Sequence, residues 1–169
     1  MEDSQLVSFL PQQLRQSIVA HRYTSLLNKT ELFGSEASKE ALGSVRDNIL
    51  WSLISSFKRQ VWLEGQIIAR SGEPCDRMFI VQHGRVEAIH PRSHIPLQAM
   101  EESMSYGDFG LFDATTKRLT VHLRASTFCE VLLLSRKDIV NIERNFPQEY
   151  HALHQLAETR REFEHSVKH

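Results

Sequence analysis

The stretch from Tyr106 to Glu130 reads YGDFGLFDATTKRLTVHLRASTFCE, and the rest of the chain is interpreted outward from it. Gly107 and Gly110 stand three residues apart. Such a backbone can turn sharply and leave its amides free to approach an anion. A charged, turn-prone segment follows, and from Leu119 apolar and polar residues alternate with the period of a half-buried strand. The stretch therefore predicts a strand, a tight turn, a short loop and a second strand.

Composition and charge describe one globular unit. The 169 residues are 41% hydrophobic and 24% charged, and 20 basic against 21 acidic residues leave a formal net charge of -1. A chain of this length and composition can bury one real core. The balanced charge and the lack of a basic stripe with interleaved aromatic residues argue against nucleic acid, so we expect no such partner.

The cysteines and the hydropathy pattern bear on the compartment. Cys75 and Cys129 lie far apart and form no CxxC motif, which predicts reduced thiols in the cytosol. No run of about eighteen apolar residues is present, and the first residues lack the basic start of a signal peptide. We therefore expect this region itself to be cytosolic.

The N-terminal third is predicted to be helical. Pro11 stands where a first helical turn tolerates proline, and Leu10, Leu14 and Ile18 recur on one face. After a small, polar stretch from Gly34, a second set of apolar residues recurs at helical spacing: Leu42, Val45, Ile49 and Leu53.

The pattern changes at Gln60 to short β-prone runs broken by Gly65, Gly72 and Gly84. Turns every seven to a dozen residues or so predict a compact antiparallel barrel or roll that extends to Leu134. The glycines are expected to be turn positions with positive φ rather than site residues. The segment 90–105, with two prolines, is predicted to be a hairpin loop, and Phe128 to Leu134 a core strand.

Two closing helices are predicted. Ser135 offers a helix N-cap with an acid, Asp138, at the third position. A break at Phe146 and Pro147 starts the second helix. Its apolar residues lie on or near one face: Tyr150, Leu153, Leu156 and Phe163.

The opening stretch resembles the phosphate-binding cassette of cyclic-nucleotide-binding domains, in which Phe-Gly-Glu, a short helical turn and Arg-Thr or Arg-Ala lead into a strand. The run from Leu123 to Cys129 is similar to the strand found there in hyperpolarisation-activated and ether-à-go-go-type cation channels. Residues 10–33 are similar to the end of the helical C-linker between channel pore and nucleotide-binding domain. The closing helices resemble the family's B and C helices, the C helix being the lid over the purine.

The resemblance implies an α+β fold with an antiparallel, jelly-roll-like β-roll. It divides the chain into C-linker-like helices over 1–33 and a cyclic-nucleotide-binding-like domain over 34–169, with the roll at about 60–134 and lid helices at about 136–165. It also implies the cytoplasmic regulatory region of a membrane cation channel, with a potassium channel as the expected class, rather than an enzyme. The expected partners are the rest of that channel and three further copies in a homo-tetramer joined through the linker helices.

The resemblance places a nucleotide pocket on a set of eight residues: Phe109, Gly110, Leu111, Phe112, Arg118, Leu119, Thr120 and Arg160. In the family, the glutamate after Phe-Gly accepts a hydrogen bond from the ribose, and the arginine before Thr pairs with the cyclic phosphate. Here Leu111 and Leu119 hold those places, with Arg118 one residue early. Leu119 is in phase with the apolar face of the strand, and Arg118 points the other way. We therefore expect no cofactor, and cAMP or cGMP to bind weakly or not at all.

Two hypotheses of different classes stay open. In one, the chain senses cAMP or cGMP and moves the lid, the linker helices and the pore. In the other, which the two leucines favour, the fold is kept as a homology domain that acts by contacts alone. A register shift at Arg118 would restore a phosphate contact, and a sodium/proton exchanger carrying the same module is a further alternative.

Other chemistry finds little support. The tripeptide from Asp108 to Gly110 spells a kinase metal-binding motif, but the other kinase motifs are missing. His151, His154 and Glu158 stand at helical spacing, yet such a set on a polar helix face is usually solvated. We therefore expect neither a metal site nor an enzyme.

Overall fold

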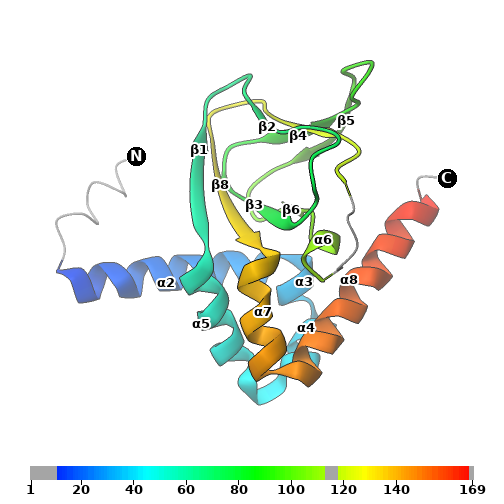
Figure 1. Ribbon diagram of the computed structural model, residues 1–169. Helices are drawn as coiled ribbons and strands as arrows, with labels where there is room; N and C mark the ends of the chain where they lie inside the picture. The colour runs from blue at the N-terminus through cyan, green and yellow to red at the C-terminus, as the bar shows by residue number, and fades with distance from the viewer. Residues whose placement is uncertain (1–10, 113–117, 168–169) are drawn as a thin grey trace.

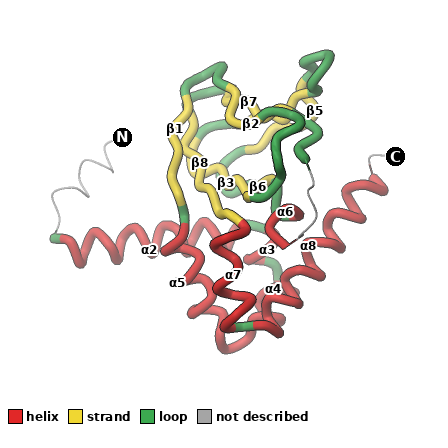
Figure 2. Tube along the Cα trace, viewed as in Figure 1, coloured by secondary structure: helices red, strands yellow, loops and turns green. Residues whose placement is uncertain are grey.

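The computed structural model describes residues 11–112 and 118–167, apart from the side chains of Arg15 and of residues 160–167. A β-roll stands on a layer of helices, with the long helix α2 crossing beneath it and α8 leaving on the opposite side (Figures 1 and 2). The helices that precede the roll are α2 (Gln12–Lys29), α3 (Glu31–Gly34), α4 (Glu36–Leu42), the 3-10 turn η1 (Gly43–Val45) and α5 (Arg46–Ser56). Over the described residues, no helix is both long enough and apolar enough to cross a membrane.

Two four-stranded antiparallel sheets form the roll. The first has the order β1 (Lys58–Trp62), β8 (Cys129–Ser135), β3 (Arg77–His83) and β6 (Ser105–Tyr106). The second has the order β2 (Ile67–Ala69), β7 (His122–Ala125), β4 (Val86–Ile89) and β5 (Pro96–Met100). The short helix α6 (Phe109–Phe112) lies between β6 and β7 in the sequence, and α7 (Arg136–Asn145) and α8 (Pro147–Val167) end the fold. The predicted α+β class with an antiparallel roll is confirmed.

The first sheet has a core on each face, because side chains alternate along its central strands. Ile80 and Leu132 face the helices, where they pack with Leu27 and Phe33. Their neighbours on the other face, which include Val131, point into the roll. A sheet covered on both sides needs nearly continuous apolar strands, which is why β8 carries almost no polar residue.

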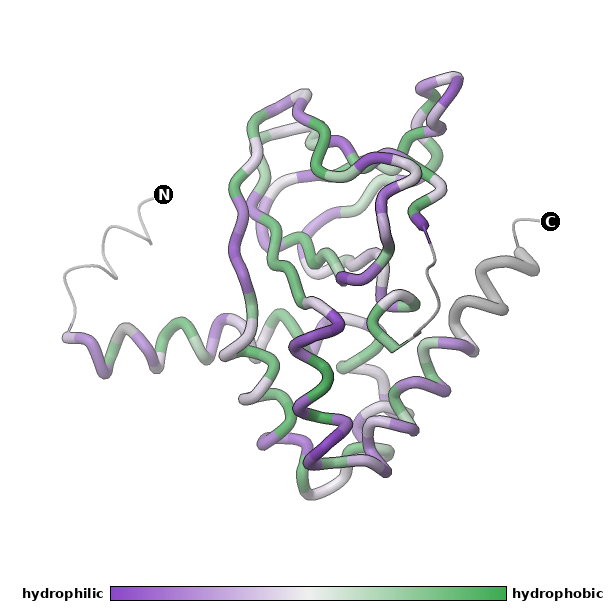
Figure 3. The backbone as a smooth tube through the Cα atoms, in the orientation of Figure 1, coloured by the Kyte–Doolittle hydropathy of each residue, from purple (hydrophilic) through white to green (hydrophobic). Residues whose placement is uncertain are grey.

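Local sequence signals at the ends of elements are confirmed. The Asp138 carboxylate accepts hydrogen bonds of 2.9 Å from both the backbone N–H and the hydroxyl of Ser135, so the capping box starts α7 as predicted. The next helix begins at Pro147. The alternation of hydrophilic and hydrophobic residues along α7 is visible in Figure 3. Gly84 has a φ of 91°, and a Cβ there would lie 2.1 Å from the carbonyl oxygen of Phe128.

Two expectations are wrong. The segment 90–105 is not only a loop, because β5 pairs along β4 within it. The strand predicted from Leu119 begins only at His122, and the bend before β8 leaves Phe128, the predicted first residue of the core strand, 38% exposed. The two strands join different sheets, β7 the second and β8 the first. Alternation reports on which side a side chain lies, but it does not report which sheet the backbone joins.

The predicted apolar stripe on the first helix is not covered within the chain. Leu14 and Ile18 of α2 are 52% and 37% exposed, whereas Leu26 and Leu27 near the other end of the helix are buried. Leu10 lies outside the described residues. The first half of α2 therefore projects beyond the roll, as Figure 1 shows.

Candidate functional site

The cassette-like stretch is built around two close approaches of the backbone. Gly107 has a φ of 92°, and a Cβ there would lie 2.6 Å from the carbonyl oxygen of Arg77. At Gly110, a Cβ would lie 2.1 Å from the carbonyl oxygen of Cys75 and 2.9 Å from its sulfur. Real Cβ atoms do not approach backbone this closely, so packing alone requires both glycines.

Two amides of this turn are not free, which corrects the expectation of a loop whose amides are open to an anion. The Gly110 N–H donates to the Gly107 carbonyl at 3.0 Å, and the Leu111 N–H donates to the Asp108 carbonyl at 3.1 Å. These bonds form the helical turn α6, where the sequence pattern predicted only a tight turn and loop. An amide that donates within a helix is unavailable to a phosphate.

The pocket residues predicted from the resemblance are divided between two cores. Leu111 is fully buried and Phe112 is 5% exposed, and both pack into the core between the roll and the helices. Leu119 is 3% exposed and packs inside the roll, where Phe109 is partly buried against the same cluster. Leu111 therefore does not lie beside Leu119 in one pocket.

One small cavity lies among the described side chains inside the roll. Its volume is about 10 Å³, close to the least that holds one water. Every side chain that lines it is apolar: Ile68, Phe79, Val81, Val86, Met100, Leu123 and Val131. This cavity is too small and too apolar to hold a nucleotide.

Arg118 is held on the turn between β2 and β3. Its Nη1 donates to the carbonyl oxygen of Gly72 at 2.7 Å, and its side chain is exposed, as the alternation predicted. Backbone hydrogen bonds join the same two segments. The Leu119 N–H donates to the Glu73 carbonyl at 2.9 Å, and the Gly72 N–H donates to the Leu119 carbonyl at 2.8 Å. Thr120 is exposed, and the side chain of Arg160 lies outside the described part of the structure.

Arg136 is a residue of this site that the sequence reasoning missed. Its Nε and Nη2 donate to the Gly110 carbonyl at 3.1 and 2.7 Å. A one-turn helix leaves its last carbonyls without helical partners, and a guanidinium that donates twice satisfies one of them. The two residues are 26 positions apart, so no local pattern could indicate the contact.

The last helix, α8, also contacts α6. The Phe112 ring stacks on His154 with centroids 5.6 Å apart and planes at 12°, and it lies 5.4 Å from the ring of Tyr150. Burial raises the pKa of the Tyr150 phenol, Glu143 raises it further, and the Arg136 guanidinium lowers it in part. α6 is therefore attached to α7 by Arg136 and to α8 by Phe112.

Replacing Arg136 by alanine should lower the free energy of unfolding by about 1.5–3 kcal/mol, because the Gly110 carbonyl loses both hydrogen bonds to a charged donor. Amide exchange should also become faster at Gly110 and Leu111. Lys137→Ala is the matched control, since Lys137 is exposed on the same turn of α7. Equal effects of the two substitutions on stability and exchange would contradict the assigned role.

No group of three or more potential metal ligands gathers in the described part of the chain. His154 lies 3.7 Å from the carboxylate of Glu158 on α8, an i,i+4 contact on a partly exposed helix face. Cys75 and Cys129 are buried and not disulfide-bonded. Cys129 thus lies in the core of β8, as its place in an apolar strand predicted.

Comparisons with known proteins agree with this fold. Over 87% of its length the chain is 22% identical to a cyclic nucleotide-gated channel of Caenorhabditis elegans and 24% identical to the cyclic nucleotide-gated channel beta-3 of Mus musculus. It spans about a fifth of these relatives, 19% and 20% of their lengths. The N-terminal domain of a transcriptional regulator from Streptomyces coelicolor A3(2), known from its crystal structure, has a TM-score of 0.63 at 22% identity. That match covers 82% of this chain and 93% of the other, and it shows a shared fold.

A family model supplies the classification. The model described as "Cyclic nucleotide-binding domain" matches residues 59–145, from β1 to the end of α7. The matched segment contains the roll, the cassette-like stretch and the first closing helix, but not residues 10–33 or the second closing helix, where the resemblance was also found. The chain therefore belongs to the cyclic nucleotide-binding domain family, with relatives among the cyclic nucleotide-gated channels.

Proposed function

We propose that this chain is a cytoplasmic regulatory domain of a membrane cation channel, in which the roll and the lid helix act on the pore through the N-terminal helices. In this proposal, residues 1–33 are the linker and 34–169 the nucleotide-binding-like domain, and the assembled form is a homo-tetramer. The relatives are channels, and the exposed Leu14 and Ile18 leave a face of α2 available to a neighbour.

We further propose that the nucleotide site is degraded. The observation that carries this proposal is the position of Arg118, whose guanidinium donates to the Gly72 carbonyl while Leu119 occupies the apolar interior of the roll. A charge-assisted arginine contact to a phosphate contributes about 1.5–3 kcal/mol, and a ribose acceptor about 1 kcal/mol more. Without both, affinity should fall by roughly a hundredfold to a thousandfold.

Titration calorimetry with cAMP and cGMP tests this directly. We expect no measurable binding, or a Kd weaker than about 0.1 mM, because Leu119 packs inside the roll and Arg118 is bound to the Gly72 carbonyl. A low-micromolar Kd would refute the degraded site. In that case Arg118→Ala, compared with Arg92→Ala in the exposed loop between β4 and β5, would show whether Arg118 leaves Gly72 to hold the phosphate.

One observation supports the alternative function, which is cyclic-nucleotide sensing. Arg118 is exposed, and one side-chain hydrogen bond holds its guanidinium in the described structure. Releasing such a bond costs about 1.5–3 kcal/mol at most, which phosphate binding could offset. The same calorimetric titration decides between the two functions.

A further inference from the structure

A charged groove lies where the helical layer meets the edge of the first sheet. The helix-facing side of β3 is apolar at Met78 and Ile80 but turns polar at Gln82, just where α2 crosses the sheet. Between α2 and the turn at 101–103 a groove of about 340 Å³ remains open. This groove is separate from the nucleotide site and from the cassette.

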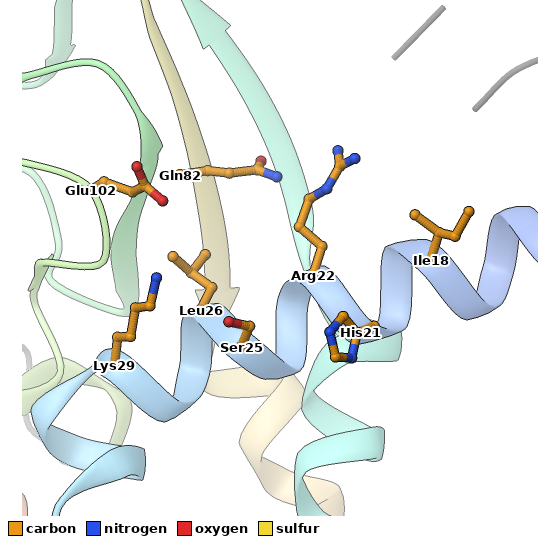
Figure 4. A pocket seen from close by; sticks show the side chains of 8 residues that line it. All are labelled: Ile18, His21, Arg22, Ser25, Leu26, Lys29, Gln82 and Glu102. Carbon is orange, nitrogen blue, oxygen red and sulfur yellow. The ribbon is translucent and has the colours of Figure 1, made fainter. Parts of the chain in front are cut away.

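The polar groups of the groove have no partners among the described residues. Arg22 and Lys29 of α2 donate no hydrogen bond, and neither pairs with a carboxylate within 4.0 Å. Glu102, on the opposite side, is equally unpaired, and the side-chain oxygen of Gln82 is closed to solvent without a donor. Figure 4 shows Arg22 and Lys29 rising from α2 toward Gln82 and Glu102, with Leu26 between them.

We propose that this groove is a docking site for an acidic segment of polypeptide. Arg22 and Lys29 can pair with an anion, whereas Glu102 and the side-chain oxygen of Gln82 can accept hydrogen bonds from N–H donors. A free phosphate ester could satisfy the two cations, but it would be repelled by Glu102 and would leave the Gln82 oxygen unsatisfied. A polypeptide brings a carboxylate for the cations and backbone N–H groups for the acceptors.

The surface next to the groove is apolar and could hold apolar side chains of the same docked segment. Ile18 lines one end of the groove, and Leu14, four residues before it, lies on the same face of α2. From Leu14 to Arg22 this face runs for about 12 Å at the rise of an α-helix. Apolar side chains of the docked segment would cover Leu14 and Ile18, the face that the proposed function leaves to a neighbouring subunit, while its carboxylate pairs with Arg22.

The occupant would connect two parts of the fold. The turn at 101–103 is bound to β3 by the Ser103 N–H, which donates to Val81 at 2.8 Å. The chain then leads through β6 to Gly107 and α6. A segment in the groove would therefore touch both α2 and the turn that leads through β6 into the cassette; its use in regulation rests on the proposed function.

The test is a ¹⁵N NMR titration of the full chain with the capped peptide Leu-Glu-Gly-Leu-Glu-Gly and with a matched peptide in which Gln replaces Glu. We expect shift changes at residues 18–29, at Gln82 and at 101–103 with the acidic peptide. Arg22→Glu should weaken its binding at least tenfold and favour a lysine-containing peptide instead. Arg144→Glu, an exposed site at the end of α7, is the matched control and should leave binding unchanged.

Three results would overturn the inference. Equally tight binding of the neutral peptide would exclude charge recognition in the groove, and so would shift changes that lie away from it. Displacement of the peptide by an equal concentration of pyrophosphate would show a simple anion site instead. Because no cyclic nucleotide enters these measurements, their failure is distinguishable from a failure of the proposed function.

Discussion

Gly110→Ala is expected to lower the free energy of unfolding by about 3 kcal/mol or more, the upper end of the range for overpacking. The added Cβ would lie 2.1 Å from the Cys75 carbonyl oxygen, a backbone atom that cannot rotate away. α6 would have to move from the turn before β3, which would also lengthen the Arg136 contact to the Gly110 carbonyl. Chemical denaturation gives the stability, and amide exchange at Leu111 reports the displacement of α6.

Gly65→Ala is the control for this substitution. Gly65 also has a positive φ, 87°, but nothing lies within 4 Å of a Cβ placed there. Gly65→Ala should lower the free energy of unfolding only by the roughly 1–2 kcal/mol that an alanine costs in the left-handed region. If Gly110→Ala cost no more than Gly65→Ala, the close packing of α6 against Cys75 would not be what requires glycine.

The second large effect is expected from Leu111→Glu, which restores the residue that the family places after Phe-Gly. Leu111 is fully buried in the core between the roll and the helices. The carboxylate would therefore be removed from water, and this apolar core offers it no cationic partner. An unpaired charge left in such a place costs about 3–5 kcal/mol. Denaturant unfolding at pH 7 should show this loss, together with no gain in cAMP affinity.

The loss should depend on pH in a defined direction. Burial raises the pKa of such a carboxyl above its unfolded value of about 4.3, so the folded variant retains its proton longer than the unfolded chain does. The deficit should be smallest below about pH 4 and grow as the pH rises toward the folded pKa. Leu97→Glu, at a site 57% exposed on β5, should show neither effect. A stable Leu111→Glu variant that bound cAMP tightly would show that the site can still open.

The sequence by itself determined the class of fold and many element boundaries, because these follow from short-range chemistry. Periodicity separates helices from strands, and the roll predicted at about 60–134 spans 58–135. Ser135 with Asp138 set the start of α7, and Pro147 set the start of α8. The cassette-like stretch also carries the resemblance to the cyclic nucleotide-binding domain family, whose model matches residues 59–145.

Only the tertiary structure decided what the cassette residues do. The alternation placed Leu119 on an apolar face, but it could not show that Leu111 packs into a different core or that β7 and β8 join different sheets. The contacts of Gly110 with Cys75 and Arg136, and that of Arg118 with Gly72, join residues 26–46 positions apart. Contacts between segments this distant are set by how whole elements pack, and local propensity carries no information about that packing.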